Sequence, residues 1–117
     1  MNEPHKIHPP LSTRLHNAWR GIVFFFADEY GRFTPLIFIV IGGFIWIVEP
    51  TRPELLVLLL AIGSSIALGM FNMVVEELCN LYSTEYNQKI KLIKDLAAGA
   101  CVFYALVVLV LFILIAL

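Results

Sequence analysis

The chain has 117 residues, of which 60% are hydrophobic and 15% are charged, and its formal net charge is −1. A water-soluble domain of this length could not bury so much apolar surface, so the composition predicts a single-domain integral membrane protein over residues 1–117. The balanced charge argues against a nucleic-acid partner, which requires a strongly basic surface.

The first predicted element is a helix at residues 11–32, with Ser12 as its expected N-cap. If Ile22 is placed at the centre of an apolar stripe, most large apolar side chains share its face and the polar ones lie opposite. We therefore expect an amphipathic helix in the membrane interface. Glu29 breaks the pattern: it follows Ile22 by seven residues, so its carboxylate points toward the protein or the membrane. The alternative is an interfacial glutamate that reaches back to water.

Three apolar segments follow, and each is predicted to span the membrane: residues 33–49, 54–80 and 91–117. The first is the shortest, because a helix counted from Phe33 is about 24 Å long at 1.5 Å per residue, slightly less than the hydrocarbon core. The sequence EPTRPE separates the first two spans, with Pro50 and Pro53 as stop signals.

The basic residues predict the orientation of the spans. Seven of the eight lysines and arginines precede the first span or lie between the second and the third, and only Arg52 lies on the other side. The positive-inside rule then places the N-terminus and the second loop in the cytoplasm.

Polar side chains interrupt the end of the second span, in the sequence FNMVVEELCN at residues 71–80. Asn72 and Glu76 are four residues apart and therefore share a helix face, which Gly69 continues inward and Asn80 continues outward. Taken alone, Asn72 is interpreted as an interhelical hydrogen-bonding residue and Glu76 as an interfacial glutamate.

Taken together with neighbours at the same expected depth, these residues favour phosphate chemistry. Glu29 adds a second carboxylate, and Lys94 and Asp95 open the third span. Carboxylates with few other ligands suit Mg²⁺, and a lysine suits a phosphate group. Phosphoryl transfer from a magnesium nucleotide relies on such positioning and charge neutralisation. The GxxxxGK[ST] motif does not occur, so a P-loop enzyme is excluded.

At these positions the chain resembles the small prokaryotic membrane lipid kinases, the diacylglycerol kinase and undecaprenol kinase family. The likeness rests on three groups of residues: Asn72-x-x-x-Glu76, then Glu85-Tyr86 with KDLAAGA at 94–100, and Trp19-Arg20-Gly21 with Glu29 eight residues later. The resemblance implies an all-α integral membrane fold with an N-terminal amphipathic surface helix and three transmembrane helices. It also implies a homotrimer whose active sites are shared between subunits at the cytoplasmic surface.

The resemblance further implies phosphorylation of a membrane lipid alcohol that depends on ATP and Mg²⁺. By position, it assigns the metal to Glu29 and Glu76, and catalysis to Asn72, Lys94 and Asp95. The nucleotide contacts that it implies are Asn17, Glu29, Glu76, Glu85, Tyr86, Asn87, Lys94 and Asp95. Asn87 departs from the histidine of some members.

One departure concerns the chemistry directly. The family carries a glutamate three residues before the asparagine, as the general base on the lipid hydroxyl, and here that position is Gly69. Asn80 likewise replaces an aspartate. A general base typically contributes about 10²- to 10⁴-fold, so its loss predicts a slow reaction, unless another carboxylate such as Asp95 replaces it.

Three hypotheses follow, in order of preference. The first is a lipid kinase with an altered base or an altered lipid. The second is a pseudokinase of the same fold, which binds nucleotide or lipid and acts as a regulatory or structural subunit. The third is a scaffold of three spans, in which the polar residues only hold the helices together.

The remaining reactive residues predict no site. Cys79 and Cys101 lie in or beside apolar segments without a CxxC motif, so we expect small buried hydrophobic side chains. His5, His8 and His16 are too few and too loosely placed for a metal site, which needs three or four ligands in fixed geometry. The polar, proline-rich start MNEPHKIHPP predicts no cleavable signal peptide.

Overall fold

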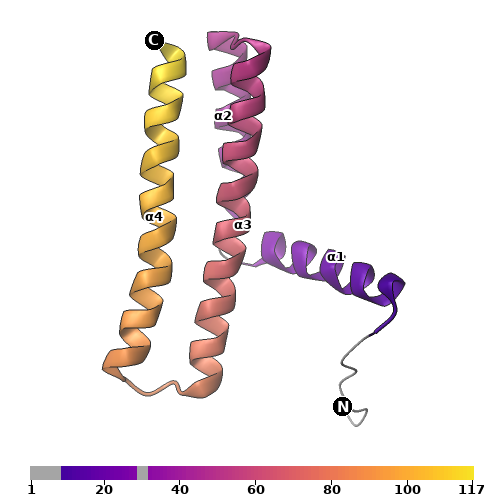
Figure 1. Cartoon of the computed structure of the whole chain (residues 1–117), viewed down its shortest axis with the longest axis vertical. Helices are drawn as coiled ribbons and strands as arrows, with labels where there is room; N and C mark the ends of the chain where they lie inside the picture. The colour runs from indigo at the N-terminus through magenta and orange to yellow at the C-terminus, as the bar shows by residue number, and fades with distance from the viewer. Residues whose placement is uncertain (1–8, 29–31) are drawn as a thin grey trace. The chain divides into compact units, whose positions relative to one another are not determined.

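The computed structural model describes residues 9–28 and 32–117 (Figure 1). This part of the chain forms four helices: α1 (Leu11–Ala27), α2 (Thr34–Val48), α3 (Arg52–Tyr82) and α4 (Gln88–Ala116). The chain divides into two units, Met1–Phe44 and Ile45–Leu117, which are taken separately below.

Both ends of α1 differ from the expectation. Ser12 lies inside the first turn and is not the N-cap, because the helix begins at Leu11 after Pro10, which has no side chain that could cap an amide. The helix ends at Ala27, not at residue 32. Asp28 is extended, with φ −76° and ψ 168°, and aspartate favours such ends because its side chain competes for backbone hydrogen bonds.

The apolar side chains of α1 are mostly uncovered. Phe25 is the buried residue of this helix, and its ring meets that of Phe26 edge to face with 5.4 Å between the centroids. Trp19 and Ile22 are exposed. A helix of this kind is suited to lie against an apolar surface, in agreement with the amphipathic pattern of the sequence.

α2 is short and has no charged residue. Its 15 residues make a helix about 22 Å long, less than the roughly 30 Å of a hydrocarbon core. Pro35 lies in the first turn, where its missing N–H is not needed. Glu49 follows the last residue with φ 53°, in the left-handed region, and its N–H donates to the carbonyl oxygen of Ile45 at 3.0 Å.

A capping box begins α3. The Glu54 N–H donates to the Thr51 hydroxyl at 3.4 Å, and the Thr51 N–H donates to the Glu54 carboxylate at 2.8 Å. Pro53, which was expected as a stop signal, lies instead in the first turn of α3. Proline is favoured there because its missing N–H would have no helical acceptor.

α3 and α4 pack side by side as an antiparallel hairpin (Figure 1). Within the described residues these two helices are long and apolar enough to cross a membrane, whereas α2 is a shorter apolar helix. Both ends of α3 lie within three residues of the ends of the predicted span 54–80, and both ends of α4 lie within three residues of the ends of the predicted span 91–117. The Cys101 thiol lies 3.7 Å from the carbonyl oxygen of Leu68 and donates to it, which joins the two helices near their middle.

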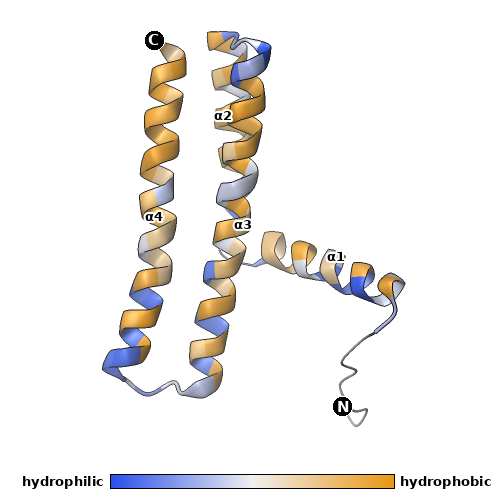
Figure 2. Cartoon of the chain, in the orientation of Figure 1, coloured by the Kyte–Doolittle hydropathy of each residue, from blue (hydrophilic) through white to orange (hydrophobic). Residues whose placement is uncertain are grey.

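The polar residues of this hairpin gather at its turn. Figure 2 shows both helices apolar over most of their length and hydrophilic where α3 ends and α4 begins. Cys79, on α3 near this end, is buried as predicted, whereas Cys101 is half-buried, and neither cysteine forms a disulfide. The candidate site is built on this polar end.

Candidate active site

Around the axis of α3, Asn72 lies near the centre of the face on which this helix buries side chains. At 100° per residue it falls within about 40° of the buried Ala61 and Cys79, and of Leu68, which contacts α4. Glu76 lies one turn nearer the α3–α4 turn on the same face, and Gly69 one turn further from it. The predicted common face of these three residues therefore coincides with the face on which α3 buries side chains.

The amide oxygen of Asn72 is buried, and no hydrogen-bond donor reaches it among the described residues. A buried acceptor without a donor costs about 1–3 kcal/mol, so most such atoms in proteins have a partner. The neighbouring Ser65 shows the usual solution, because its hydroxyl donates to the carbonyl oxygen of Ala61 at 2.9 Å. Asn72 Oδ1 is thus able to accept from a group other than the residues that the structure describes.

Lys94 reaches across the hairpin. Its Nζ donates to Asn80 Oδ1 at 2.7 Å, and this bond joins α4 to α3 across the turn. A helical side chain leans toward the N-terminus of its helix, so a lysine two turns into α4 extends back toward the turn, where Asn80 lies. The predicted phosphate-binding lysine is therefore held at the polar end of the hairpin.

Asp95 makes a different contact from Lys94. Its carboxylate accepts a hydrogen bond from Lys91 at 2.5 Å, within α4, and both side chains are more than half exposed. This pair has the i,i+4 spacing of a helix-surface ion pair. The contact engages one carboxylate oxygen, Oδ2, and leaves Oδ1 available as an acceptor, so the substitution of Asp95 for the missing general base stays a prediction.

The turn between α3 and α4 is held by its own side chains. The Glu85 N–H donates to the Ser83 hydroxyl at 3.1 Å, and the side chain of Asn87 caps α4 by accepting from the N–H groups of Lys89 and Ile90 at 2.8 and 3.3 Å. Glu85, Tyr86 and Asn87, the predicted nucleotide-contacting stretch, are all exposed. The turn presents these side chains to solvent on a fixed backbone.

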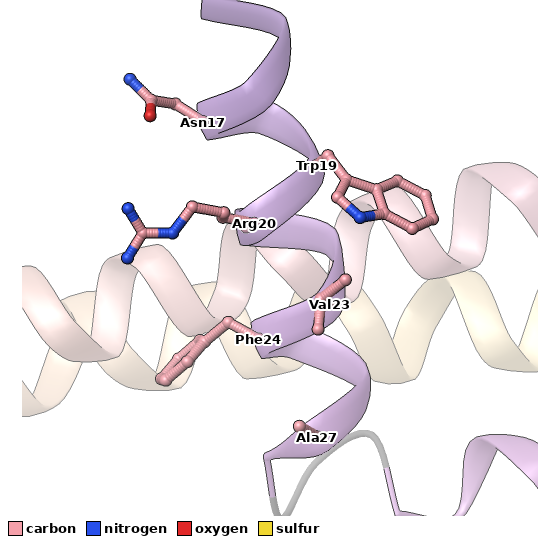
Figure 3. Close-up of a pocket in the computed structure, with 7 residues that line it drawn as sticks. Asn17, Trp19, Arg20, Val23, Phe24 and Ala27 are labelled. Atoms are coloured by element: carbon pink, nitrogen blue, oxygen red, sulfur yellow. The ribbon is translucent and has the colours of Figure 1, made fainter. Parts of the chain in front are cut away.

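The predicted site residues of the first unit are only partly described. Asn17 lies on α1, in an open hollow whose other lining residues also come from α1 (Figure 3). The side chains of Asn17, Arg20 and Phe24 project from the same side of this helix, and Gly21 contributes no side chain between them. Glu29, the second predicted metal ligand, lies outside the described residues.

The residues of α3 fit the metal proposed from the sequence. Magnesium takes oxygen ligands and keeps several waters, so it needs few protein groups. Glu76 offers a half-buried carboxylate, and Asn72 one turn away offers the unpartnered oxygen. Among the described residues, no three His, Cys, Asp or Glu side chains form a metal-binding group. His16 lies exposed on α1, whereas His5 and His8 lie outside the described residues.

The described residues define a small all-helical protein, in which two helices are long and apolar enough to cross a membrane and meet at a polar turn. A family model described as prokaryotic diacylglycerol kinase matches residues 16–116. The chain therefore belongs to the prokaryotic diacylglycerol kinase family, a family of membrane lipid kinases, as the resemblance predicted. No curated protein and no solved structure gives a significant match.

Two roles at the polar end were not predicted from the sequence. Asn80 was predicted to continue the face of Asn72 and Glu76 and was noted as a replacement for an aspartate, but its bond to Lys94 was not foreseen. The role of Asn87 as the N-cap of α4 was likewise not foreseen, and its predicted nucleotide contact stays a prediction. A signal for the capping role was present, because an asparagine immediately before a helical pattern is a typical N-cap.

Proposed function

We propose that the protein transfers the γ-phosphoryl group of ATP to the hydroxyl group of a membrane lipid alcohol of the diacylglycerol or undecaprenol type. The observation that carries this proposal is the family match over residues 16–116, which includes the whole polar end of the hairpin. The retention of Asn72, Glu76 and Lys94 at that end supports the proposal.

In the proposed reaction, the lipid hydroxyl oxygen attacks the γ-phosphorus, the bond to the β–γ bridging oxygen breaks and ADP leaves. The hydroxyl proton passes to water, because Gly69 offers no carboxylate to accept it. Mg²⁺, when bound, would neutralise the phosphate oxygens, with Glu29 and Glu76 as its ligands. Lys94 would add a positive charge on the phosphates. Asn72 Oδ1, which is buried and has no donor within residues 9–28 and 32–117, would accept from a bound group and orient it.

The reaction requires a particular placement in the membrane, which is also proposed. We place α2, α3 and α4 across the bacterial inner membrane, with α1 at the cytoplasmic surface and three copies in one assembly. The seven basic residues on the N-terminal and α3–α4 turn side support this orientation. A single cysteine at Thr51→Cys, in a chain without Cys79 and Cys101, should be labelled only from the periplasmic side of the membrane. Labelling from the cytoplasm would overturn the orientation.

A pseudokinase is the second candidate, and one observation favours it. Gly69 supplies no carboxylate at the position where the family carries its general base. A protein with this site would still bind a magnesium nucleotide but transfer its phosphoryl group slowly or not at all.

A transfer assay separates the candidates. The purified protein in mixed micelles is given labelled ATP, Mg²⁺ and a panel of lipid alcohols, and any phosphorylated lipid is identified. Product that disappears in Lys94→Met supports the kinase. Nucleotide binding without product with any lipid supports the pseudokinase. Absence of both activities would leave only the scaffold of three spans.

A further inference from the structure

The apolar length of α4 carries one hydroxyl group. Between Leu96 and Leu117 only Cys101 and Tyr104 have a polar side-chain atom. The Cys101 thiol already has an acceptor in the carbonyl oxygen of Leu68. The Tyr104 hydroxyl makes no hydrogen bond within the part of the chain that the structure describes. Hydrocarbon offers such a group no water, so we expect it to bond to a partner other than the described residues.

Tyr104 lies on the face of α4 that packs against α3. It follows Cys101 by three residues and Lys94 by ten, and all three side chains are half-buried. The thiol contact places Cys101 at the level of Leu68, next to Gly69, so the backbone of Tyr104 is about 4.5 Å further along α4 at 1.5 Å per residue. A helical side chain leans toward the N-terminus of its helix, which directs the Tyr104 hydroxyl back toward the level of Gly69.

The level of Gly69 is where the proposed function places the reacting hydroxyl of the lipid. A diacylglycerol has ester carbonyl groups a few bonds from that hydroxyl, on the side of its acyl chains and therefore deeper in the membrane. A carbonyl oxygen accepts a hydrogen bond from a phenolic O–H. A polyprenol continues from its hydroxyl as hydrocarbon and offers no such acceptor. Tyr104 therefore suits a glycerol ester better than a polyprenol.

We propose that Tyr104 is a specificity-determining residue for the lipid, and that its hydroxyl donates a hydrogen bond to an ester carbonyl oxygen of a diacylglycerol. This inference rests on the proposed function and chooses between the two lipid types that it names. A bound ester would give the Tyr104 hydroxyl the acceptor that the described residues do not provide. A bound polyprenol would leave the hydroxyl unpaired in an apolar site, which disfavours that lipid.

The test uses Tyr104→Phe, which removes the hydroxyl group and keeps the ring. KM and kcat are measured in mixed micelles with Mg²⁺ and ATP for three lipids: a diacylglycerol, a dialkyl ether of glycerol with the same free hydroxyl but no carbonyl, and a polyprenol. In the wild type, KM for the ester should be lower than KM for the ether by about three- to tenfold, as for one hydrogen bond. Tyr104→Phe should raise KM for the ester by the same factor and leave KM for the ether unchanged.

Tyr82→Phe is the matched control. Tyr82 is the last residue of α3 and is exposed, so this variant removes the same group at the turn, away from the level of Gly69. It should leave KM unchanged for all three lipids. The unfolding temperature of Tyr104→Phe is measured as well, because a merely structural role would lower it and would change KM for the three lipids alike.

The outcomes separate the role of Tyr104 from the proposed function. If Tyr104→Phe leaves KM for the ester unchanged, or raises KM for the ether as much, the role of Tyr104 is overturned while lipid phosphorylation stands. A wild type that prefers the polyprenol to the diacylglycerol overturns it in the same way. If the wild type phosphorylates none of the lipids, the proposed function and the role of Tyr104 fail together.

Discussion

The turn of the α3·α4 hairpin and its apolar length are stabilised by different kinds of contact. At the turn, directional bonds fix the backbone and the lysine, through Ser83, Asn87 and the Asn80–Lys94 pair. Along the apolar length, the side-chain bonds of the described residues are weaker or local, as in the Cys101–Leu68 contact and the Ser65–Ala61 bond. The positions of side chains are therefore fixed most strictly at the turn, where phosphates would bind. They are fixed least along the apolar length, which lipid would surround.

Gly69 lies on the apolar length of α3, next to Leu68, and its substitution is expected to have the largest effect. If the protein is a kinase that lacks only its base, Gly69→Glu should raise lipid phosphorylation by about 10²- to 10⁴-fold, because a carboxylate would then reach the hydroxyl of the lipid. Gly69→Gln, which is similar in size but cannot take the proton, is the control and should not raise it. Equal rates in both variants, with nucleotide still bound, would show that the missing base is not the defect.

Glu76 tests the polar region directly. Glu76→Gln should weaken the binding of ATP by about 100-fold in the presence of Mg²⁺, as expected when a metal ligand is lost. Removal of Mg²⁺ with EDTA should weaken wild-type binding similarly, because phosphates beside carboxylates need a cation between them. Glu77→Gln, one residue away and exposed, is the control and should bind as wild type does. Nucleotide binding that is equally tight in EDTA would rule out this site.

Asn87 tests whether the turn is held by its cap. Asn87→Ala should lower the stability of α4 by about 1 kcal/mol and speed amide hydrogen exchange at Lys89 and Ile90, because both amides lose their acceptor. Asn87→Ser retains a capping oxygen and should exchange nearly as slowly as wild type. Fast exchange in wild type would mean that the cap does not hold the turn.

Glu49 lies before α3, at the end of the second unit away from the α3–α4 turn. Its substitution is expected to have the smallest effect on stability. Its left-handed backbone is unfavourable for a residue with a Cβ, so Glu49→Gly should raise the unfolding free energy by roughly 0.5–1 kcal/mol. Glu49→Ala removes the carboxylate but keeps the Cβ, and should show no gain. Nucleotide affinity should not change in either variant, which confines the effect to the end of the hairpin away from the site.

The sequence predicted the helices better than their ends. Long apolar runs identify α3 and α4, because few other structures accommodate so many consecutive apolar residues. Pro53 was misassigned because a proline that stops one helix and one that begins the next have the same local sequence, and only the capping box of Thr51 and Glu54 distinguishes them. Asp28 ended α1 early although the apolar spacing continued beyond it.

The candidate site was predictable in composition but not in contacts. Asn72 and Glu76 share a face by spacing alone, and the structure places that face among the buried residues of α3. The bond between Lys94 and Asn80 depends on the path of the turn and on the rotamer of a long side chain, which no spacing rule provides. Glu29 lies outside the described residues, so the proposed metal pair of Glu29 and Glu76 stays a prediction.

The exposed surface of α4 has a consequence for how the protein is held together. None of its residues, all of which lie in the described part of the chain, is buried. Apolar side chains gain little free energy by leaving lipid for a neighbouring helix. In a bilayer, contacts of this surface with lipid and with protein would therefore differ little in free energy. Any assembly of copies through α4 would then follow mass action, and its stability would decrease as the protein is diluted with lipid.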